Sequence, residues 1–388
     1  MSITRRRAGV VGAIAPVAIL VAVGCGTSQA TQTAQTDSAR TSTTTPATST
    51  PPATSASVVS LQRIVGQTII TELPGPTASA AFLTRVQRGE IGGVVLFAWN
   101  LGANGPATLI ARLQAAATLG KNPPLVIAID QEGGIVKRLP GAPTLAPPQM
   151  TTAVIAHAQG LETARNLARY GINVDLAPVT DVGHGGFITP RTFGRTPTTV
   201  SVRAIAFAKG LMAGKVAPTL KHFPGLGYAT TTTDTSSVTV NASRAALLAD
   251  LTPVRVGIAA DVPLIMVSTA TYPGLGVRIP AAISPTIVDG LLRTTMKFHG
   301  VAITDALATA AVTRYASVSA AAVLAIRSGI DMVTPIGTTA AHSVTYSEDA
   351  FDAELAAAER GQIPLSTLDA AYKRILAMKT HLLTHATG

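Results

Sequence analysis

The stretch LVIAIDQEGGIVKRLP, residues 125–140, contains the pattern that decides the fold. Its first five residues are apolar without interruption, and the apolar run ends at Asp130. A strand with one exposed face alternates apolar and polar residues, whereas an unbroken apolar run is typical of a strand covered on both faces. We therefore expect Leu125–Asp130 to be a buried strand of a parallel sheet, with Asp130 at its carboxyl end.

The same kind of run recurs along the chain, separated by longer Ala-rich segments with helical character. The expected strands are Thr68–Glu72, Gly93–Phe97, Leu125–Asp130, Asn173–Leu176, Thr219–His222, Leu264–Ser268, Val301–Asp305 and Asp331–Pro335. The expected helices are Ser79–Arg88, Ala107–Ala117, Glu162–Tyr170, Val202–Ala213, Arg244–Ala259, Pro285–Lys297, Ala308–Ile326, Glu348–Glu359 and Ser366–Leu382. Eight strand-plus-helix units predict an α/β fold of the (β/α)8 TIM barrel type, as a single catalytic domain.

A doubly wound open sheet is the competing architecture. It requires a glycine-rich phosphate turn after its first strand, and no GxGxxG motif occurs there. In a barrel, the active site lies at the carboxyl ends of the strands. The polar residues that end the apolar runs are therefore the candidates for chemistry: Asp130, Glu132, Asp181, Lys221, His222 and Asp305.

The amino-acid composition excludes several classes of protein. The chain has 388 residues, of which 47% are hydrophobic and 13% charged, so it is not a disordered protein. One cysteine excludes an intramolecular disulfide, and the seven histidines do not cluster at metal-ligand spacing. The formal charge of +10 is spread over separated Lys and Arg, with only 4% aromatic residues, which argues against nucleic-acid binding. We expect no metal, no cofactor and no nucleic-acid partner.

The first 57 residues have the composition of an export signal and a tether. Arg5–Arg7 precede an apolar run, Ala8–Gly24, which predicts a signal peptide over residues 1–24. The sequence AVGC ending at Cys25 resembles a bacterial lipoprotein box, which implies lipidation of Cys25; an ordinary signal peptide or a retained anchor is the alternative. Residues 25–57 are rich in Ser, Thr and Pro and predict a disordered stalk before a barrel over residues 58–388. We expect a protein secreted across the cytoplasmic membrane and held at the envelope by a lipid anchor.

Several longer motifs stand at the strand ends. They are IAIDQEGGIVKRLP (127–140), GINVDLAPVTDV (171–182), PRTFG (190–194), LKHFPGLG (220–227), GVAITDAL (300–307) and SGIDMV (328–333), with GGVVLFAWNL (92–101) before them. In this order they resemble the N-terminal domain of glycoside hydrolase family 3, especially the single-domain bacterial β-N-acetylglucosaminidases. The resemblance covers almost all of residues 60–385.

The resemblance implies a role for each matching position. Asp305 matches the nucleophile of a retaining mechanism, which must be an ionised carboxylate. Asp130 matches the acceptor for hydroxyls of the terminal sugar, and the donors around that sugar match Arg138, Arg191, Lys221 and His222. We expect the cationic neighbours of Asp305 to hold its pKa low. Taken singly, these residues also fit purely structural roles. Lys221 and His222 could be a surface pair, and Asp305 could cap a helix.

The chain departs from the family pattern at the loop after LKHFPGLG. Family members carry an Asp–His dyad there as the proton donor, whereas this chain has Asp234 and then Ser236 at the histidine position. Leu226, Ile135 and Thr269 replace a histidine, an arginine and a further histidine. We expect Asp234 to be the general acid, with His184 or a partner chain as alternatives.

The leading hypothesis is a retaining β-glycosidase that releases terminal β-linked N-acetylglucosamine from cell-wall fragments through a glycosyl-enzyme on Asp305. Its substrate partner is a carbohydrate, and we expect a monomer. A β-glucosidase-like member is one alternative. A weakly active or inactive barrel that binds envelope glycans is another, because the histidine of the dyad is missing while the sugar-binding residues are present.

Overall fold

The core of the computed structural model is a curled parallel sheet of seven strands, which confirms the α/β class. The structure describes residues 59–103, 105–337 and 339–384. The expected signal peptide, Cys25 and the stalk lie outside the described residues. The strand order is β1-β2-β3-β6-β7-β8-β9, with every neighbouring pair parallel. These strands are β1 (Ile70–Thr71), β2 (Gly93–Leu96), β3 (Val126–Ile129), β6 (Val174–Asp175), β7 (Ala217–Phe223), β8 (Leu264–Val267) and β9 (Val301–Thr304).

The last expected strand, Asp331–Pro335, does not form a regular strand. Met332 makes a single parallel bridge to Ile303 in β9, and Val333 makes one to Ile69, which precedes β1. The amide of Ile70 also donates to the carbonyl of Val333 over 2.9 Å. The segment therefore connects the two edge strands of the sheet through isolated bridges.

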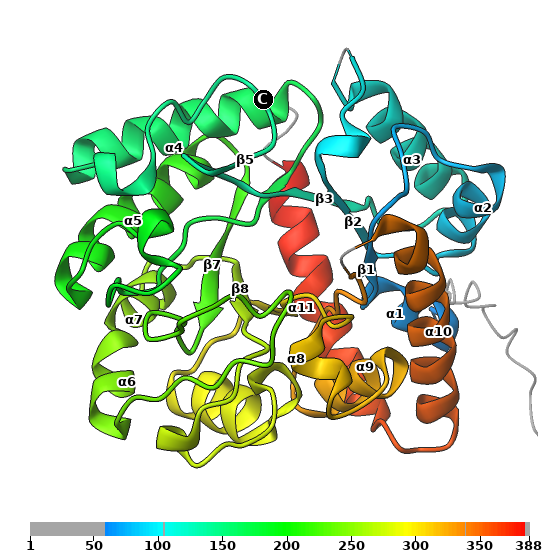
Figure 1. Cartoon of the computed structure of the whole chain (residues 1–388). Coiled ribbons are helices and arrows are strands. Elements are labelled where there is room, and N and C mark those ends of the chain that lie inside the picture. Colours follow the sequence, from blue (N-terminus) through cyan, green and yellow to red (C-terminus); the bar gives the residue numbers. More distant parts are fainter. Residues whose placement is uncertain (1–58, 104, 338, 385–388) are drawn as a thin grey trace, which may run out of the picture. The chain divides into compact units, whose positions relative to one another are not determined.

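Helices surround the strands, as Figure 1 shows. Their bounds are α1 (Leu61–Gln67), α2 (Ala80–Arg88), α3 (Ala107–Leu119), α4 (Ala153–Ala168), α5 (Pro197–Ala213), α6 (Arg244–Asp250), α7 (Thr252–Ile258), α8 (Ala310–Thr313), α9 (Val318–Arg327), α10 (Ala340–Glu359) and α11 (Leu365–Thr384). A π-helix covers Thr286–Thr295, and short 3-10 helices cover Ala98–Asn100, Pro147–Gln149, Thr189–Arg191, Pro273–Leu275 and Ala281–Ile283.

Several helix boundaries differ from those expected from sequence. The expected helix Glu162–Tyr170 begins earlier, at Ala153, because the Thr152 side chain accepts the amide of Ile155 as an N-cap. The expected helix Arg244–Ala259 is two helices, with Pro253 in the first turn of the second, where a missing N–H costs no hydrogen bond. Ala308–Ile326 is likewise divided, and Ser317 caps its second part.

Sequence reasoning missed two elements. Helix α1 precedes the first strand, and its Ser60 side chain accepts the amide of Arg63 as an N-cap. A short antiparallel hairpin, β4 (Gln131–Gly133) with β5 (Val136–Lys137), follows β3. The hairpin lies inside the stretch that predicted the β3 strand, and it turns the chain back over the carboxyl end of the sheet.

The strands are covered on both faces, as the unbroken apolar runs predicted. Val94 and Leu96 of β2 belong to the apolar layer beneath the helices, whereas Val95 belongs to a separate inner cluster. Ile375 and Met378 of α11 join that inner cluster. Apolar side chains therefore fill the inside of the curled sheet as well as its outer surface.

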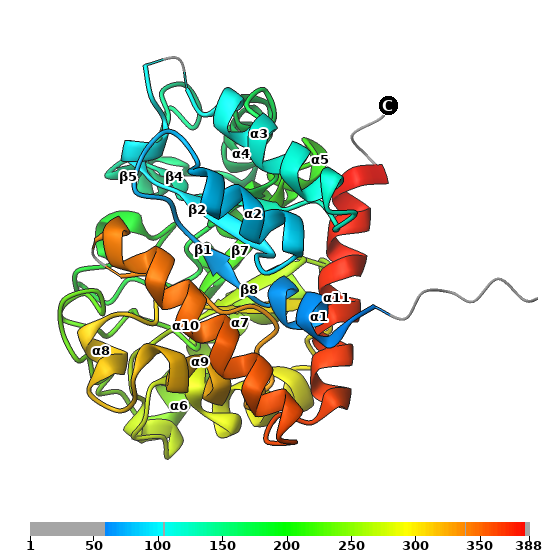
Figure 2. The same ribbon diagram turned by 90° about the vertical axis from the view of Figure 1, so that its right-hand side faces the viewer.

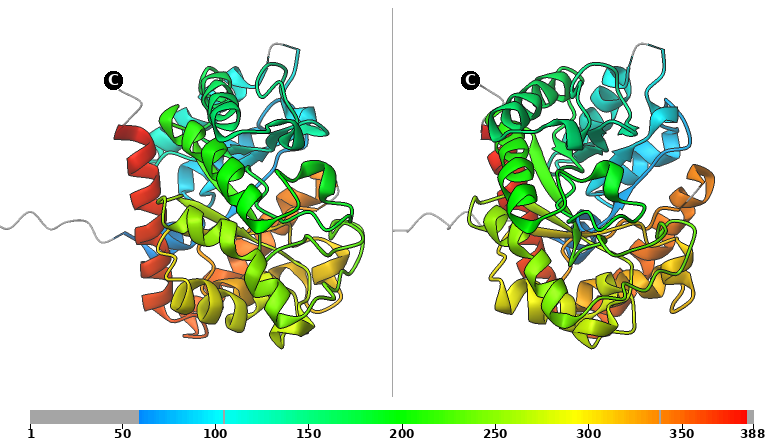
Figure 3. Two further views of the ribbon diagram at one scale, coloured as in Figure 1. Left: turned by 90° about the vertical axis from the view of Figure 1, so that its left-hand side faces the viewer. Right: turned by 60° about the vertical axis from the view of Figure 1, so that its left-hand side comes forward.

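Helix α11 lies at the end of the sheet where the strands begin. The Lys379 ammonium donates to the carbonyl of Gly92, directly before β2, over 2.8 Å, and to the Gln67 side chain over 2.7 Å. Figure 2 shows α11 beside α1, and Figure 3 shows the loops that follow the strands on the side away from α11. The carboxyl ends of the strands thus remain free of this helix.

A buried carboxyl group in α10 couples the stability of the fold to pH. Glu354 is fully buried, and its Oε2 lies 2.6 Å from the hydroxyl of Thr68, with no charged partner. Burial raises the pKa of Glu354 to about 8, against about 4.3 in an unfolded chain. The folded protein therefore holds a proton on Glu354 that the unfolded chain releases. The contribution of the protonated Glu354 to the free energy of unfolding is fully present below pH 4, and it is lost as pH rises through 8.

Glu354→Gln is expected to reduce this loss of stability. The neutral amide replaces the protonated carboxyl group without a charge that must be buried at high pH. Between pH 5 and pH 9, the melting temperature of the wild type should fall by about 5 °C or more relative to that of the variant. Glu359→Gln, at an exposed position of the same helix, is the control. A wild type and a Glu354→Gln variant with parallel pH profiles would contradict the prediction.

Candidate active site

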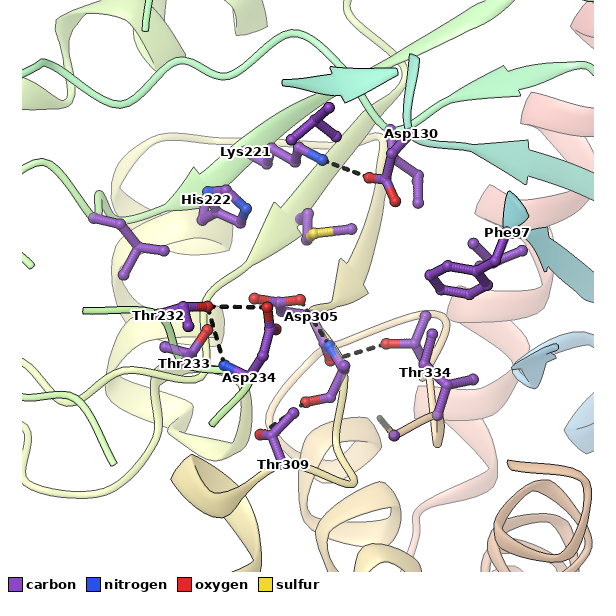
Figure 4. Close-up of a pocket in the computed structure, with 18 of the residues that line it drawn as sticks. Phe97, Asp130, Lys221, His222, Thr232, Thr233, Asp234, Asp305, Thr309 and Thr334 are labelled. Atoms are coloured by element: carbon purple, nitrogen blue, oxygen red, sulfur yellow. Dashed lines mark hydrogen bonds and ion pairs between the residues drawn. The ribbon is translucent and has the colours of Figure 1, made fainter. Parts of the chain in front are cut away.

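A pocket opens at the carboxyl ends of the strands and encloses about 430 Å³. All seven residues that the sequence selected for catalysis or sugar binding line it: Asp130, Arg138, Arg191, Lys221, His222, Asp234 and Asp305. Figure 4 labels Asp130, Lys221, His222, Asp234 and Asp305 among them. They come from segments as far apart in sequence as β3 and β9. Parallel strands place their carboxyl ends at one edge, and this brings the seven together.

A buried cluster of opposite charges forms one side of the pocket. The Lys221 ammonium lies 2.7 Å from Oδ1 of Asp130 and 2.8 Å from Oε1 of Glu132. The Arg191 guanidinium donates to both oxygens of Glu132, over 2.7 and 2.9 Å. Arg138 approaches Oδ2 of Asp130 to 3.5 Å. Each buried charge in the cluster therefore has a partner of opposite sign.

The cluster keeps its members ionised. Burial alone would raise the pKa of Asp130 and of Glu132, but the neighbouring cations outweigh it and the net shift is downward. Burial opposes the charge on Lys221, and the two carboxylates more than compensate, so its pKa is raised. Asp130 is thus a carboxylate acceptor and Lys221 an ammonium donor at neutral pH.

His222 is held by a second buried acid. Oδ2 of Asp181 lies 2.8 Å from Nδ1 of His222, and Oδ1 of Asp181 accepts the amide of Leu226 over 2.7 Å. The carboxylate accepts a hydrogen bond from Nδ1–H, which leaves Nε2 free to face the pocket. Lys221 and His222 are only 2% and 6% exposed, so the interpretation of them as a surface pair is wrong.

Asp305 follows β9 at the base of the pocket. Its backbone amide donates to the carbonyl of Val267 in β8, and its Oδ1 accepts the amide of Ala306 over 2.8 Å. It does not cap a helix, because α8 begins at Ala310 with Thr309 at the N-cap.

The expectation of a low pKa for Asp305 is wrong. Burial raises the pKa of this carboxyl group, and the charge of Asp234 adds to the rise. His222 and Lys221 act in the opposite direction but do not outweigh burial. The cations that were expected to lower the pKa of Asp305 are instead neutralised by carboxylates of their own, Lys221 by Asp130 and Glu132.

Asp234 lies on an exposed loop at the same pocket. Its Oδ2 accepts the hydroxyl of Thr232 over 2.9 Å, and Figure 4 shows its side chain beside that of Asp305. Ser236, at the position of the expected histidine, does not line the pocket, whereas the buried Leu226 does. The described part of the pocket thus presents Asp234 without a histidine from this loop.

His184 occupies a different place. Its Nε2 lies 2.7 Å from Oδ2 of Asp250, and its ring stacks on Tyr228 with centroids 3.7 Å apart. It is not among the residues that line the pocket. This position disfavours His184 as the proton donor.

The comparisons with known proteins agree with the geometry. Residues 62–378 match the glycosyl hydrolase family 3 N terminal domain. The chain belongs to glycoside hydrolase family 3. It is 32% identical over 340 residues to an uncharacterized secreted glycosyl hydrolase of Arthroderma benhamiae, covering 84% of this chain and 95% of the relative. It is 31% identical to a beta-hexosaminidase of Xylella fastidiosa, covering 68% and 82%.

Solved structures of glycosidases share the fold. A β-N-acetylglucosaminidase from Paenibacillus superposes with a TM-score of 0.80 at 30% identity, covering 85% of this chain and 64% of that one. A β-N-acetylhexosaminidase from Beutenbergia cavernae gives 0.75 at 31% identity, covering 83% and 99%. This family 3 protein is accordingly a glycoside hydrolase of the β-N-acetylhexosaminidase-like type.

Several features in and behind the pocket of this family 3 hydrolase were not predicted from the sequence. Glu132 and Asp181 were noted as strand-end acids, but their roles as partners of Arg191 and His222 follow only from the structure. Phe97 and Trp99 also line the pocket, and the single tryptophan of the chain was an available signal. Asp175 lies buried behind Gln131, and burial raises its pKa to about 8.

Two further observations concern only the part of the chain that the structure describes. No group of three or more His, Cys, Asp or Glu side chains there is arranged to hold a metal ion. Among the helices of the described ranges, none is long and apolar enough to cross a membrane.

Glu132→Ala is expected to destabilise the fold strongly. The change leaves Arg191 without its carboxylate and Lys221 with one of two, and an uncompensated buried charge costs about 3–5 kcal/mol. Urea unfolding measures the effect. Glu162→Ala, which removes an exposed ion pair with Arg165, should cost less than about 1 kcal/mol. Equal costs for the two variants would show that the buried cluster contributes no more than a surface pair.

Proposed function

We propose that this glycoside hydrolase releases terminal β-linked N-acetylglucosamine from cell-wall fragments with retention of configuration. The observation that carries the proposal is the placement of Asp305 and Asp234 beside one another, facing the buried Asp130–Lys221 pair in one pocket. Retaining glycosidases need a nucleophilic carboxylate, a proton donor and acceptors and donors for the sugar hydroxyls. The pocket has a residue for each requirement.

In the proposed sugar site, Asp130 accepts hydrogen bonds from hydroxyls of the terminal sugar. Lys221 and Arg138 donate to its oxygens. Because the Nδ1–H of His222 donates to Asp181, Nε2 of the neutral ring accepts a hydrogen bond from a sugar hydroxyl, which corrects the expected role of His222 as a donor. Arg191 donates at the pocket wall while Glu132 fixes its orientation. The charges are oriented before the sugar enters, so binding requires little rearrangement of the protein.

In the first step, a carboxylate oxygen of Asp305 attacks the anomeric carbon, and the bond from that carbon to the leaving oxygen breaks. Asp234 transfers its proton to the leaving oxygen. In the second step, water attacks the anomeric carbon, Asp234 takes its proton, and Asp305 is released. Because the pKa of Asp305 is raised, we expect the acid limb of the activity to lie above the ordinary Asp value of about 3.9.

We propose that Asp331–Pro335 serves as the eighth strand of a closed (β/α)8 barrel over residues 58–388, supported by its bridges to both edges of the sheet. We further propose that residues 1–24 direct secretion and that a lipid on Cys25 holds a monomer at the envelope through the stalk 25–57. Membrane fractionation of the protein and of a Cys25→Ser variant tests the anchor.

Trapping the glycosyl-enzyme tests the nucleophile. Incubation with a ring-fluorinated N-acetylglucosaminyl fluoride, whose fluorine slows breakdown of the intermediate, should add one sugar to a peptide that contains Asp305. Peptide mass spectrometry locates the adduct. Asp305→Asn should carry none, and Asp289→Asn, at an exposed position outside the pocket, should be labelled like the wild type. Absence of an adduct while glycan binding persists would favour the glycan-binding barrel.

Asp234→Ala tests the proton donor. Loss of general acid catalysis should lower kcat/KM for a disaccharide, a poor leaving group, by about 10²–10⁴. A dinitrophenyl glycoside departs without a proton, so its glycosylation step should change only a few-fold. Thr235→Ala, next to Asp234 on the loop, is the control. An equal loss on both substrates would rule out Asp234 as the acid.

A further inference from the structure

Two aromatic side chains form the wall of the pocket that follows β2. Phe97 and Trp99 both line the pocket, and their rings stack with centroids 4.8 Å apart and planes 11° from parallel. Trp99 is 43% exposed, whereas Lys221 is only 2% exposed. The tryptophan therefore lies at the rim of the pocket, and the charged cluster lies deep.

The exposed indole is held in a fixed position. Its Nε1 donates to the carbonyl of Leu73 over 3.0 Å. The buried Asn100 donates to the carbonyls of Leu73 and Gly75 and accepts the amide of Phe97 over 2.8 Å. A large exposed apolar side chain gains nothing from burial, so its fixed orientation is the feature expected of a preorganised binding surface.

The aromatic pair is continuous with the proposed sugar site. The guanidinium of Arg138 lies over the Phe97 ring, 5.7 Å from its centroid, and also approaches Asp130 to 3.5 Å. Nε of Arg138 is buried and has no partner among the described residues. One side chain thus connects the aromatic wall to the deep end of the pocket.

We propose that Phe97 and Trp99 form a stacking platform for the sugar ring adjacent to the one that is released. This inference rests on the proposed function and extends it to the leaving group. The C–H face of a pyranose is apolar and flat enough to bury against an aromatic ring. The released sugar occupies the deep site at Asp130 and Asp305, so the ring at the rim is the next one along the chain. Arg138 lies at the junction of the two sugar positions.

The stacking platform predicts which class of substrate the enzyme prefers. The enzyme prefers glycans with a second pyranose ring over glycosides with a small leaving group. Figure 4 shows Phe97 on the side of Asp305 away from Thr232 and Thr233, so the second ring lies between the aromatic wall and the loop that carries Asp234. This placement brings the glycosidic oxygen toward the proposed acid.

Trp99→Ala is expected to lower kcat/KM for N,N′-diacetylchitobiose about tenfold or more, the effect of losing one aromatic contact of ordinary strength. N-acetylglucosaminyl fluoride has no second ring, and its kcat/KM should stay within about twofold. Trp99→Phe, which keeps a ring, should restore most of the loss on the disaccharide. Tyr315→Ala removes an exposed aromatic outside the pocket and is the matched control. Equal effects of Trp99→Ala on the two substrates would overturn the platform.

Fluorescence separates this inference from the proposed function. Trp99 is the only tryptophan in the chain, so its emission reports directly on the platform. Saturating disaccharide should shift the emission, and N-acetylglucosamine alone should not. A shift without turnover of either substrate would support the platform and overturn the proposed glycosidase activity. Turnover of the disaccharide without a shift would overturn the platform and leave the proposed function standing.

Discussion

The buried pairing of Lys221 with Asp130 and Glu132 is the interaction on which the pocket depends. Each of these charges would be costly inside the protein without its partners. Together they join β3, the β4–β5 hairpin and β7, and through Arg191 they include the 3-10 helix Thr189–Arg191. A site that needs fixed charges in a dry environment thus obtains them from a network in which each charge is stabilised by the others.

The two ends of the curled sheet have different roles: one contributes to the stable core, and the other forms the pocket. At the end where the strands begin, α11 adds apolar side chains to the inner core, and Asp331 pairs with Arg293 and Arg374. At the other end, the polar residues that follow the strands line the pocket. The first end has a filled apolar core, whereas the second exposes Asp234 and Trp99 to solvent. The end where the strands begin therefore stabilises the fold, and the carboxyl end of the same sheet is open to substrate.

The departure of the Asp234 loop from the family pattern changes the balance of charges near Asp305. A histidine in the loop would bring a titratable ring to the pocket. Leu226 instead brings a buried apolar side chain, and Ser236 is not among the residues that line the pocket. The pocket retains its sugar-facing charges despite this loss. Its aromatic rim, a feature independent of the loop, supplies apolar contact in a site otherwise dominated by ionised groups.

The sequence alone determined the βα order, the polar residues at the strand ends and the family, because apolar periodicity and local motifs lie in contiguous residues. The seven residues that it selected for catalysis or sugar binding are all among those that line the pocket. Only the tertiary structure decided which charge pairs with which, the raised pKa of Asp305, the hairpin after β3 and the stacking of Trp99 on Phe97. These depend on burial and on distances between segments far apart in the chain, and neither quantity is encoded in any single stretch of residues.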